Sequence, residues 1–358
     1  MTARAGHGHS AGPGADSDPD AYVDEALSGF GLGGAAWAAL PRGLKARAYR
    51  VTTQEGSWLL KWHPARAESL LQRSHEVVRA LVEAGFPAPA VRVSPRGESL
   101  VTTPAGLFSL QAWVEGMQVS IAEREETFAR WPELATTLGR VVGDLHRLAA
   151  PAMEWGGAPA DPERLLAGPR ATVGSIKHGP PHRFRKLARV RLRRPRTEFD
   201  DWLLSRLPDL AARARGLAAP RTRDLIDGAD EVLGHNDWNW ENLILDGHGG
   251  VAAVVDYDNV ARLPRALEVG AAAVVLVGAD PARLEAFLDG YAQGSQVAVS
   301  PQAARVGMQW KCVRSSLWSV DSYLSGRARD TDMLLTWCTH LEEALGAVAP
   351  LGTSAESA

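Results

Sequence analysis

Residues 233–246 read Leu-Gly-His-Asn-Asp-Trp-Asn-Trp-Glu-Asn-Leu-Ile-Leu-Asp, and residues 251–258 read Val-Ala-Ala-Val-Val-Asp-Tyr-Asp. The first stretch contains the pattern HxDxxxxN, formed by His235, Asp237 and Asn242. Asp256 follows 14 residues after Asn242, at the end of an apolar run typical of a strand. Because residues 247–250 (Gly-His-Gly-Gly) predict a hairpin turn, we expect the chain to fold back and to bring Asn242 and Asp256 to one point.

These residue types suit phosphoryl transfer. Such a reaction needs one carboxylate to accept or orient the attacking hydroxyl, and an amide oxygen with a second carboxylate to hold magnesium against the phosphates. Mg²⁺ prefers hard oxygen ligands and retains several waters, so two protein ligands are sufficient. The pattern therefore predicts Asp237 as the catalytic residue and Asn242 and Asp256 as the metal ligands.

The composition changes along the chain. Residues 1–20 are rich in Gly, Ala, Ser, His and Pro without an apolar period, which predicts a disordered tail. Residues 21–115 predict strands at 48–53, 57–62, 91–93, 99–103 and 107–114, with a helix at 65–84. Residues 116–350 are mostly helical, with helices predicted at 134–148, 199–217, 265–277, 282–293, 301–324 and 330–345.

The sequence resembles the aminoglycoside phosphotransferase and choline kinase superfamily, the protein-kinase-like kinases of small molecules. The family's catalytic loop is similar to His235-Asn236-Asp237 with Asn242, and its magnesium strand is similar to 255–258 (Val-Asp-Tyr-Asp). The resemblance implies an α+β, protein-kinase-like two-lobed fold with a small β-rich N-lobe and a larger helical C-lobe. It also implies that ATP and Mg²⁺ bind between the lobes and that Asp237 is the catalytic base or hydroxyl-orienting residue.

The resemblance extends to the nucleotide contacts. Lys61, at the end of Leu59-Leu60-Lys61, is similar to the family's strand lysine that contacts the α- and β-phosphates. Its implied helix partner is Glu76, with Glu68 as the alternative. The lobe connection resembles residues 108–116 (FSLQAWVEG), whose backbone would read the adenine edge at Gln111, Trp113 and Val114.

Three departures from the family pattern concern the phosphate loop, the strand exit and the catalytic loop. The expected phosphate loop at 41–49 has a single glycine, Gly43. Glu268 stands where the family usually has an aspartate. Trp238 and Trp240 are bulky residues inside the catalytic loop, and they leave the acceptor open.

Two other features bear on the acceptor. Residues 177–196 contain nine Lys or Arg and no acid, which fits a peptide or anionic partner, or a solvated surface segment. Few aromatic residues are interleaved there, which disfavours nucleic acid. Trp310, Trp318 and Tyr323 on one predicted helix fit either an aromatic cage for a cationic acceptor or core packing.

Composition narrows the alternatives. The net charge of −3 gives no whole-protein signal for nucleic acid or membrane, and no run of eighteen apolar residues is present. The two cysteines, Cys312 and Cys338, lie far apart and predict buried thiols of a cytoplasmic protein. We therefore expect a phosphotransferase with a small-molecule hydroxyl substrate: an antibiotic, an amino sugar, choline or ethanolamine, a homoserine-like compound or a peptide residue. The alternative is a catalytically inactive pseudokinase that binds a partner such as a peptide.

Overall fold

The computed structural model describes residues 18–40, 47–64, 68–178, 181–226, 228, 230–328 and 330–347. The chain forms two compact units. The first runs to Glu115 and includes Ala252–Asp258, and the second contains Gly116–Val251 and the residues from Asn259 onward. Residues 1–17 of the predicted tail lie outside the described residues. Its last three residues are described, because Asp18 caps a 3-10 helix that begins with Pro19 and Asp20.

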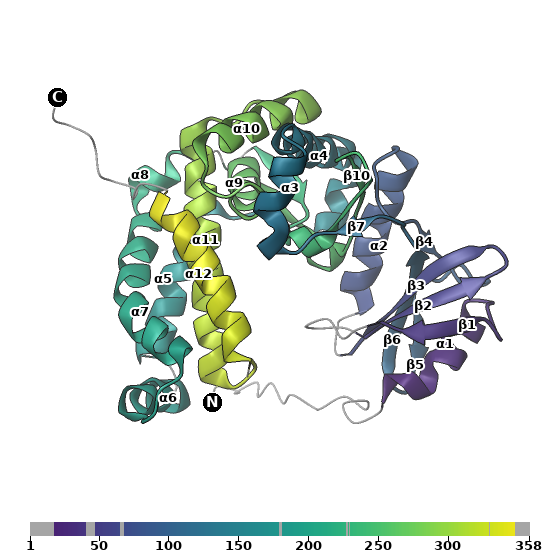
Figure 1. Cartoon of the computed structure of the whole chain (residues 1–358), viewed down its shortest axis with the longest axis horizontal. Helices are drawn as coiled ribbons and strands as arrows, with labels where there is room; N and C mark the ends of the chain where they lie inside the picture. Colours follow the sequence, from purple (N-terminus) through teal and green to yellow (C-terminus); the bar gives the residue numbers. More distant parts are fainter. Residues whose placement is uncertain are drawn as a thin grey trace, which may run out of the picture. The chain divides into compact units, whose positions relative to one another are not determined.

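The first unit is built on a six-stranded antiparallel sheet of order β1-β2-β3-β6-β4, with β5 paired to β6. Its elements are η1 (Pro19–Tyr22), α1 (Val23–Gly29), β1 (Ala36–Ala39), β2 (Ala48–Thr53), β3 (Gly56–His63), α2 (Glu68–Glu83), β4 (Val91–Arg92), β5 (Val101–Thr103) and β6 (Gly106–Ala112). The predicted hairpin at 48–62 is confirmed, with Ala48 opposite Lys61 and Thr53 opposite Gly56. Figure 1 shows α1 lying on this sheet.

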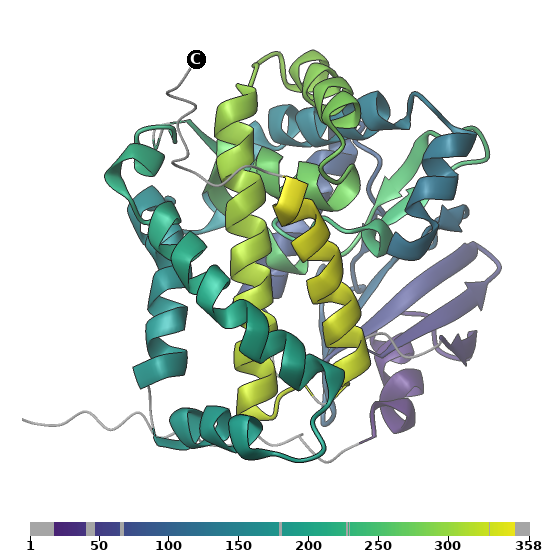
Figure 2. The same ribbon diagram turned by 60° about the vertical axis from the view of Figure 1, so that its left-hand side comes forward.

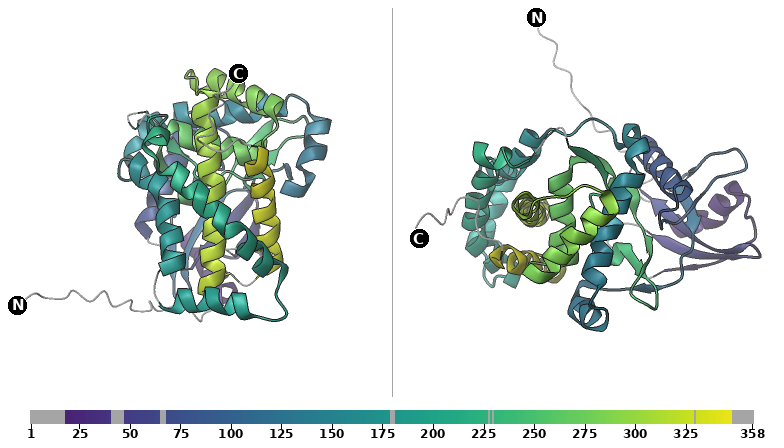
Figure 3. Two further views of the ribbon diagram at one scale, coloured as in Figure 1. Left: turned by 90° about the vertical axis from the view of Figure 1, so that its left-hand side faces the viewer. Right: turned by 90° about the horizontal axis from the view of Figure 1, so that it is seen from above.

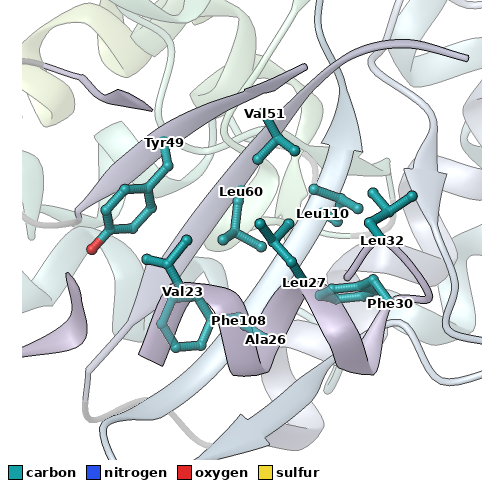
Figure 4. Close-up of a cluster of buried hydrophobic side chains, with 10 residues drawn as sticks. All are labelled: Val23, Ala26, Leu27, Phe30, Leu32, Tyr49, Val51, Leu60, Phe108 and Leu110. Carbon is teal, nitrogen blue, oxygen red and sulfur yellow. The ribbon is translucent and has the colours of Figure 1, made fainter. Parts of the chain in front are cut away.

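The core of the first unit lies between α1 and the sheet (Figure 4). Val23, Ala26, Leu27 and Phe30 recur at helical spacing, so their side chains form one face of the helix. They pack against buried residues of β2, β3 and β6: Tyr49, Val51, Leu60, Phe108 and Leu110. Burial of each large side chain stabilises the unit by about 1.5–3 kcal/mol. This packing holds β3, and with it Lys61, in a rigid sheet.

The second unit is mostly helical. Its helices are η2 (Ile121–Glu123), α3 (Arg124–Arg130), α4 (Leu134–Leu148), η3 (Ala150–Gly156), α5 (Pro162–His178), α6 (Pro181–Leu192), α7 (Glu198–Leu217), α8 (Pro220–Arg223), η4 (Trp240–Asn242), α9 (Arg265–Leu276), α10 (Pro281–Ser295), α11 (Pro301–Ser325) and α12 (Thr331–Ala347). Figure 2 shows α7, α11 and α12 packed side by side. In the right view of Figure 3, α11 is seen nearly end-on among its neighbouring helices.

Short strands complete the second unit. They are β7 (Met117–Gln118), β8 (Glu231–Gly234), β9 (Leu243–Leu245) and β11 (Ala261–Pro264). β10 (Val251–Val254) leads from this unit into the 252–258 segment, where η5 (Tyr257–Asn259) follows. β8 pairs with β11 and β7 with β9, both antiparallel.

Glycines on α4 and α10 allow the two helices to touch backbone to backbone. A Cβ at Gly139 would overlap the carbonyl oxygen of Phe287, and one at Gly143 would overlap that of Tyr291. Gly290 and Gly294 on α10 make the reciprocal contacts with α4. The contact buries His146, whose Nδ1 lies 2.9 Å from the hydroxyl of Tyr291.

We therefore expect Gly139→Ala to destabilise the protein by about 1–3 kcal/mol, because the added methyl forces two helix backbones apart. Gly174→Ala in α5 is the matched control, since its Cβ would meet nothing within 4 Å. That change is expected to be neutral or to stabilise by up to about 1 kcal/mol through helix propensity. Urea unfolding of both variants measures the difference, and equal stabilities would contradict the packing described here.

Both cysteines are buried, as the sequence predicts, and burial raises the pKa of each thiol to about 12. Among the helices of the described ranges, none combines the length and hydropathy that a bilayer crossing requires.

Candidate active site

The pairing of β8 with β11 positions the catalytic loop in the second unit. Gly234 stands opposite Ala261, so residues that follow β8 meet residues that precede β11. Asn236 Nδ2 donates to the carbonyl of Asn259 at 3.1 Å, and Asn259 Nδ2 donates to Oδ2 of Asp237 at 2.8 Å. Asn259, which precedes β11, thus orients the side chain of Asp237.

Asn242 is fixed beside Asp237 by two hydrogen bonds. Its backbone N–H donates to Oδ1 of Asn239 at 2.9 Å, and its Nδ2 donates to the carbonyl of Asp237 at 2.9 Å. Asn242 Oδ1 and Asp237 Oδ1 have no hydrogen-bond partner among the described residues. The loop therefore presents one amide oxygen and one carboxylate oxygen as available acceptors, and these are hard ligands of the kind that Mg²⁺ prefers.

Two non-glycine residues of the catalytic loop and the predicted magnesium strand have left-handed backbone conformations, Asn236 with φ 61° and Asp256 with φ 65°. Asparagine and aspartate tolerate this region better than other L-residues. Asn236 therefore adopts a conformation that glycine would adopt without strain. In addition, its N–H donates to Oε1 of Glu268 at 2.9 Å.

Substitutions at position 236 test this conformation. Asn236→Ala and Asn236→Gly both lose the side-chain bond to Asn259, but only alanine has a Cβ that opposes a left-handed backbone. We expect the alanine variant to be less stable than the glycine variant by about 1 kcal/mol. Chemical denaturation checks the order, and an alanine variant as stable as the glycine variant would contradict it.

The loop tryptophans are buried in the core. Trp238 is 2% exposed and donates from Nε1 to Glu268 Oε1 at 2.9 Å, and Trp240 is fully buried with its ring edge against Phe128. Glu268 on α9 thus holds the loop by accepting hydrogen bonds from two of its residues. From the sequence, Glu268 was notable only because the family usually has an aspartate there. Burial raises the pKa of Glu268, and the bonds from Asn236 and Trp238 partly offset this effect.

In the first unit, Lys61 joins Asp256 and Asp258. Lys61 Nζ lies 2.6 Å from Asp256 Oδ1 and 3.0 Å from Asp258 Oδ2. Burial lowers the pKa of the Lys61 ammonium, but the two carboxylates outweigh it and the pKa is raised. The segment that carries them is attached to the unit by Val254, whose N–H donates to the carbonyl of Pro87 at 2.8 Å. The strand lysine and the predicted metal ligand Asp256 are therefore neighbours.

The predicted pair of Lys61 with Glu76 is not formed. Glu76 instead bonds Arg79, one turn along α2. The alternative, Glu68, accepts a hydrogen bond from Gln72 Nε2. A carboxylate and a guanidinium three residues apart on a helix meet locally, and Lys61 takes its carboxylates from the 252–258 segment.

The three residues predicted to read the adenine edge differ in whether their backbone groups already have hydrogen-bond partners. Gln111 lies in β6 between β3 and β4, so its backbone faces a strand on each side. The N–H of Trp113 donates to the carbonyl of Ser57 at 3.1 Å. Val114 has no backbone partner among the described residues, so it is the residue of the three with both groups available. Gly43 of the predicted phosphate loop lies outside the described residues.

The aromatic residues of α11 have separate surroundings. Trp310 is buried and donates from Nε1 to the carbonyl of Leu165, whereas Trp318 is 50% exposed. The hydroxyl of Tyr323 donates to Asp200 at 2.6 Å, and its ring packs edge-on against Phe199. Trp310 is thus a core residue, whereas Tyr323 is partly exposed and is held by Asp200 and Phe199. The basic segment forms the end of α5, helix α6 and the following turn.

Sequence reasoning did not assign roles to Asn259 and Glu268. Asn259 follows Asp258 directly, and a polar residue so close to the predicted magnesium motif was a usable signal. The contact of Glu268 with the loop depends on the packing of α9, for which the sequence contains no local signal.

Comparisons with known proteins agree with this fold. The sequence profile of the Phosphotransferase enzyme family, which includes aminoglycoside phosphotransferases, matches residues 36–304. An aminoglycoside phosphotransferase from Alicyclobacillus acidocaldarius aligns at 15% identity over 91% of this chain and 94% of its own, with a TM-score of 0.64. A spectinomycin phosphotransferase solved with ADP and spectinomycin aligns at 12% identity over 90% and 95%, with a TM-score of 0.64. A search of curated proteins finds no match.

A choline kinase from Cryptosporidium parvum is also similar, at 13% identity over 89% of this chain and 93% of its own, with a TM-score of 0.56. The fold is thus the α+β fold of the protein-kinase type, with a small antiparallel-sheet lobe and a helical lobe. The chain belongs to the Phosphotransferase enzyme family.

Proposed function

We propose that this protein transfers the γ-phosphoryl group of ATP, with Mg²⁺, to a hydroxyl group of a small molecule. Family membership supports a phosphotransferase. The observation that carries the proposal is the state of Asp237: one carboxylate oxygen is held by Asn259 and the other has no partner among the described residues.

Asp237 is the proposed catalytic residue. Its bond from Asn259 fixes the carboxylate, so that Oδ1 can accept the proton of the acceptor hydroxyl and orient its oxygen for attack. Because the reaction requires little covalent chemistry from the protein, a fixed carboxylate contributes mainly by positioning.

Asn242 and Asp256 are the proposed ligands of Mg²⁺. The amide of Asn242 is turned so that its nitrogen bonds Asp237 and its oxygen has no partner in the described part of the chain, which fits a metal ligand. Asp256 contributes a carboxylate oxygen. When bound, Mg²⁺ neutralises the phosphate charge that develops during transfer.

Lys61 and Val114 are the proposed nucleotide contacts. Lys61 is a cation on a rigid strand beside Asp256, where it can bind phosphate oxygens. Val114 offers the N–H and C=O that an adenine edge requires.

An acceptor screen tests the function. We expect purified protein with MgATP to form ADP in the presence of one member of a hydroxyl panel that includes choline, ethanolamine, homoserine, amino sugars and hydroxy acids. Phosphorus NMR of the product should show a phosphate monoester, and EDTA should abolish the reaction. A protein that neither binds MgATP nor forms ADP with any acceptor would contradict the proposal and favour the pseudokinase alternative.

A further inference from the structure

Lys311, on α11, is a buried lysine without a counter-ion. Its residue is 7% exposed, and its ammonium has no hydrogen bond or ion pair among the described residues. Burial lowers the pKa of this ammonium, and the charge of Asp237 is the largest effect opposing that decrease. A desolvated cation with unused donors therefore lies within electrostatic reach of the proposed catalytic carboxylate.

Helix packing explains this location. Gly270 on α9 and Gly307 on α11 bring the two helix backbones into contact, since a Cβ at either position would overlap the other helix. Lys311 is four residues after Gly307, so it lies on the same face of α11, one turn along. Glu268 is two residues before Gly270 on α9. Its Oε2 is buried without a hydrogen-bond partner, yet Lys311 forms no ion pair with it.

Arg314 adds a second cation on α11, three residues later. Its guanidinium lies over the ring of Trp310, 4.9 Å from the centroid, and has no carboxylate partner among the described residues. Arg314 is an exposed residue, and the charges of Glu268 and Asp237 act on its guanidinium. The charges of Asp237 and Glu268 thus act on both Lys311 and Arg314, and among the described residues neither carboxylate bonds either cation.

We propose that Lys311 and Arg314 bind an oxyanion of the acceptor, so that the substrate is a hydroxyl compound carrying a carboxylate or phosphate group. This inference rests on the proposed function. The buried ammonium of Lys311 lacks an acceptor, which is costly, and a substrate oxyanion supplies it with a charge-assisted partner. Arg314, an exposed residue three positions later on the same helix, adds a second donor group. The ring of Trp310 holds the Arg314 guanidinium in place for this contact. A polycationic acceptor would meet two like charges close to Asp237.

Two other roles are possible for these cations, and the test separates them. They could balance only the charge of Glu268, in which case no small anion would bind to them. Alternatively, they could contact the phosphates of ATP, in which case their removal would weaken MgATP binding.

Ligand-observed NMR with three related compounds tests the inference. Glycerate carries a carboxylate, glycerol 3-phosphate carries a phosphate, and glycerol is the neutral reference. We expect at least one of the two anions to bind the intact protein at least about tenfold more tightly than glycerol, and which anion binds identifies the group. Lys311→Met should weaken that binding at least about tenfold. Arg314→Gln is the second variant, in case Lys311→Met does not fold.

Arg305→Met is the matched control, because Arg305 is an exposed cation on the same helix. It should leave anion binding unchanged. Failure of both anions to bind more tightly than glycerol, an equal loss in Arg305→Met, or a parallel loss of MgATP affinity in Lys311→Met would each overturn the inference. Calorimetry of MgATP binding to the unmodified protein is run separately. Absence of MgATP binding there contradicts the proposed function, whereas the results above concern only the anion site.

Discussion

Asp237→Ala is expected to reduce acceptor-dependent ADP formation by about a thousandfold or more. The variant loses the carboxylate that accepts and orients the hydroxyl, and such groups typically contribute 10²–10⁴-fold. The fold should survive, because the side chain is only partly buried and forms one side-chain hydrogen bond, with Asn259. Its loss costs about 1 kcal/mol. Initial rates and thermal unfolding measure both effects.

Two further variants sharpen this test. Asp237→Asn keeps an oxygen for the bond from Asn259 but removes the charge, so it should be nearly as inactive as the alanine variant. Glu241→Ala removes an exposed carboxylate four residues away in the same loop, and it should keep near-normal activity. Turnover by Asp237→Ala within a few-fold of the unmodified protein would exclude Asp237 as the catalytic residue.

Lys61→Met is expected to lower kcat/KM for ATP by about 10²–10³-fold, the usual effect of removing one fixed cationic or donor group from a charged transition state. It should also destabilise the first unit by about 1–2 kcal/mol, because Asp256 and Asp258 lose the cation between them. Steady-state kinetics and chemical denaturation measure the two effects.

Glu76→Gln is the informative companion to Lys61→Met. Since Glu76 bonds Arg79 and not Lys61, we expect its kcat/KM for ATP to change by less than about threefold. A loss similar to that of Lys61→Met would show that Glu76 braces the lysine during the reaction, as the family resemblance implied.

Much of the fold was predictable because its signals are local. The hairpin at 48–62 and the helix at 134–148 have clear periods and turn residues, and the structure matches them within a residue or two. Helix α1 was missed although Val23, Ala26, Leu27 and Phe30 have helical spacing, because its seven residues are fewer than a periodic pattern normally needs to indicate a helix. The β8–β11 pair places Gly234 opposite Ala261, about 27 residues later in the chain. Such short strands cannot be recognised from the sequence until they pair.

The site residues likewise divide into those with a local sequence signal and those whose contacts depend on packing. Asp237, Asn242 and Asp256 were predicted from the spacing of a short motif together with the family resemblance, and they stay predictions. Partner choice was not predictable: Glu76 and Glu68 were the candidate partners of Lys61, whereas its ammonium lies beside Asp256 and Asp258. The loop tryptophans suggested an effect on the acceptor, but burial against Phe128 and Glu268 makes them core residues.

The most direct test of MgATP-dependent catalysis is calorimetric titration of ATP into the unmodified protein and Asp256→Asn, each with Mg²⁺ and with EDTA. We expect the unmodified protein to bind ATP at least about tenfold more tightly with Mg²⁺ than with EDTA, because the metal bridges the nucleotide to its protein ligands. Asp256→Asn should lose most of this difference and retain its fold. Absence of ATP binding, or equal affinity of the unmodified protein with Mg²⁺ and with EDTA, would contradict the proposed function.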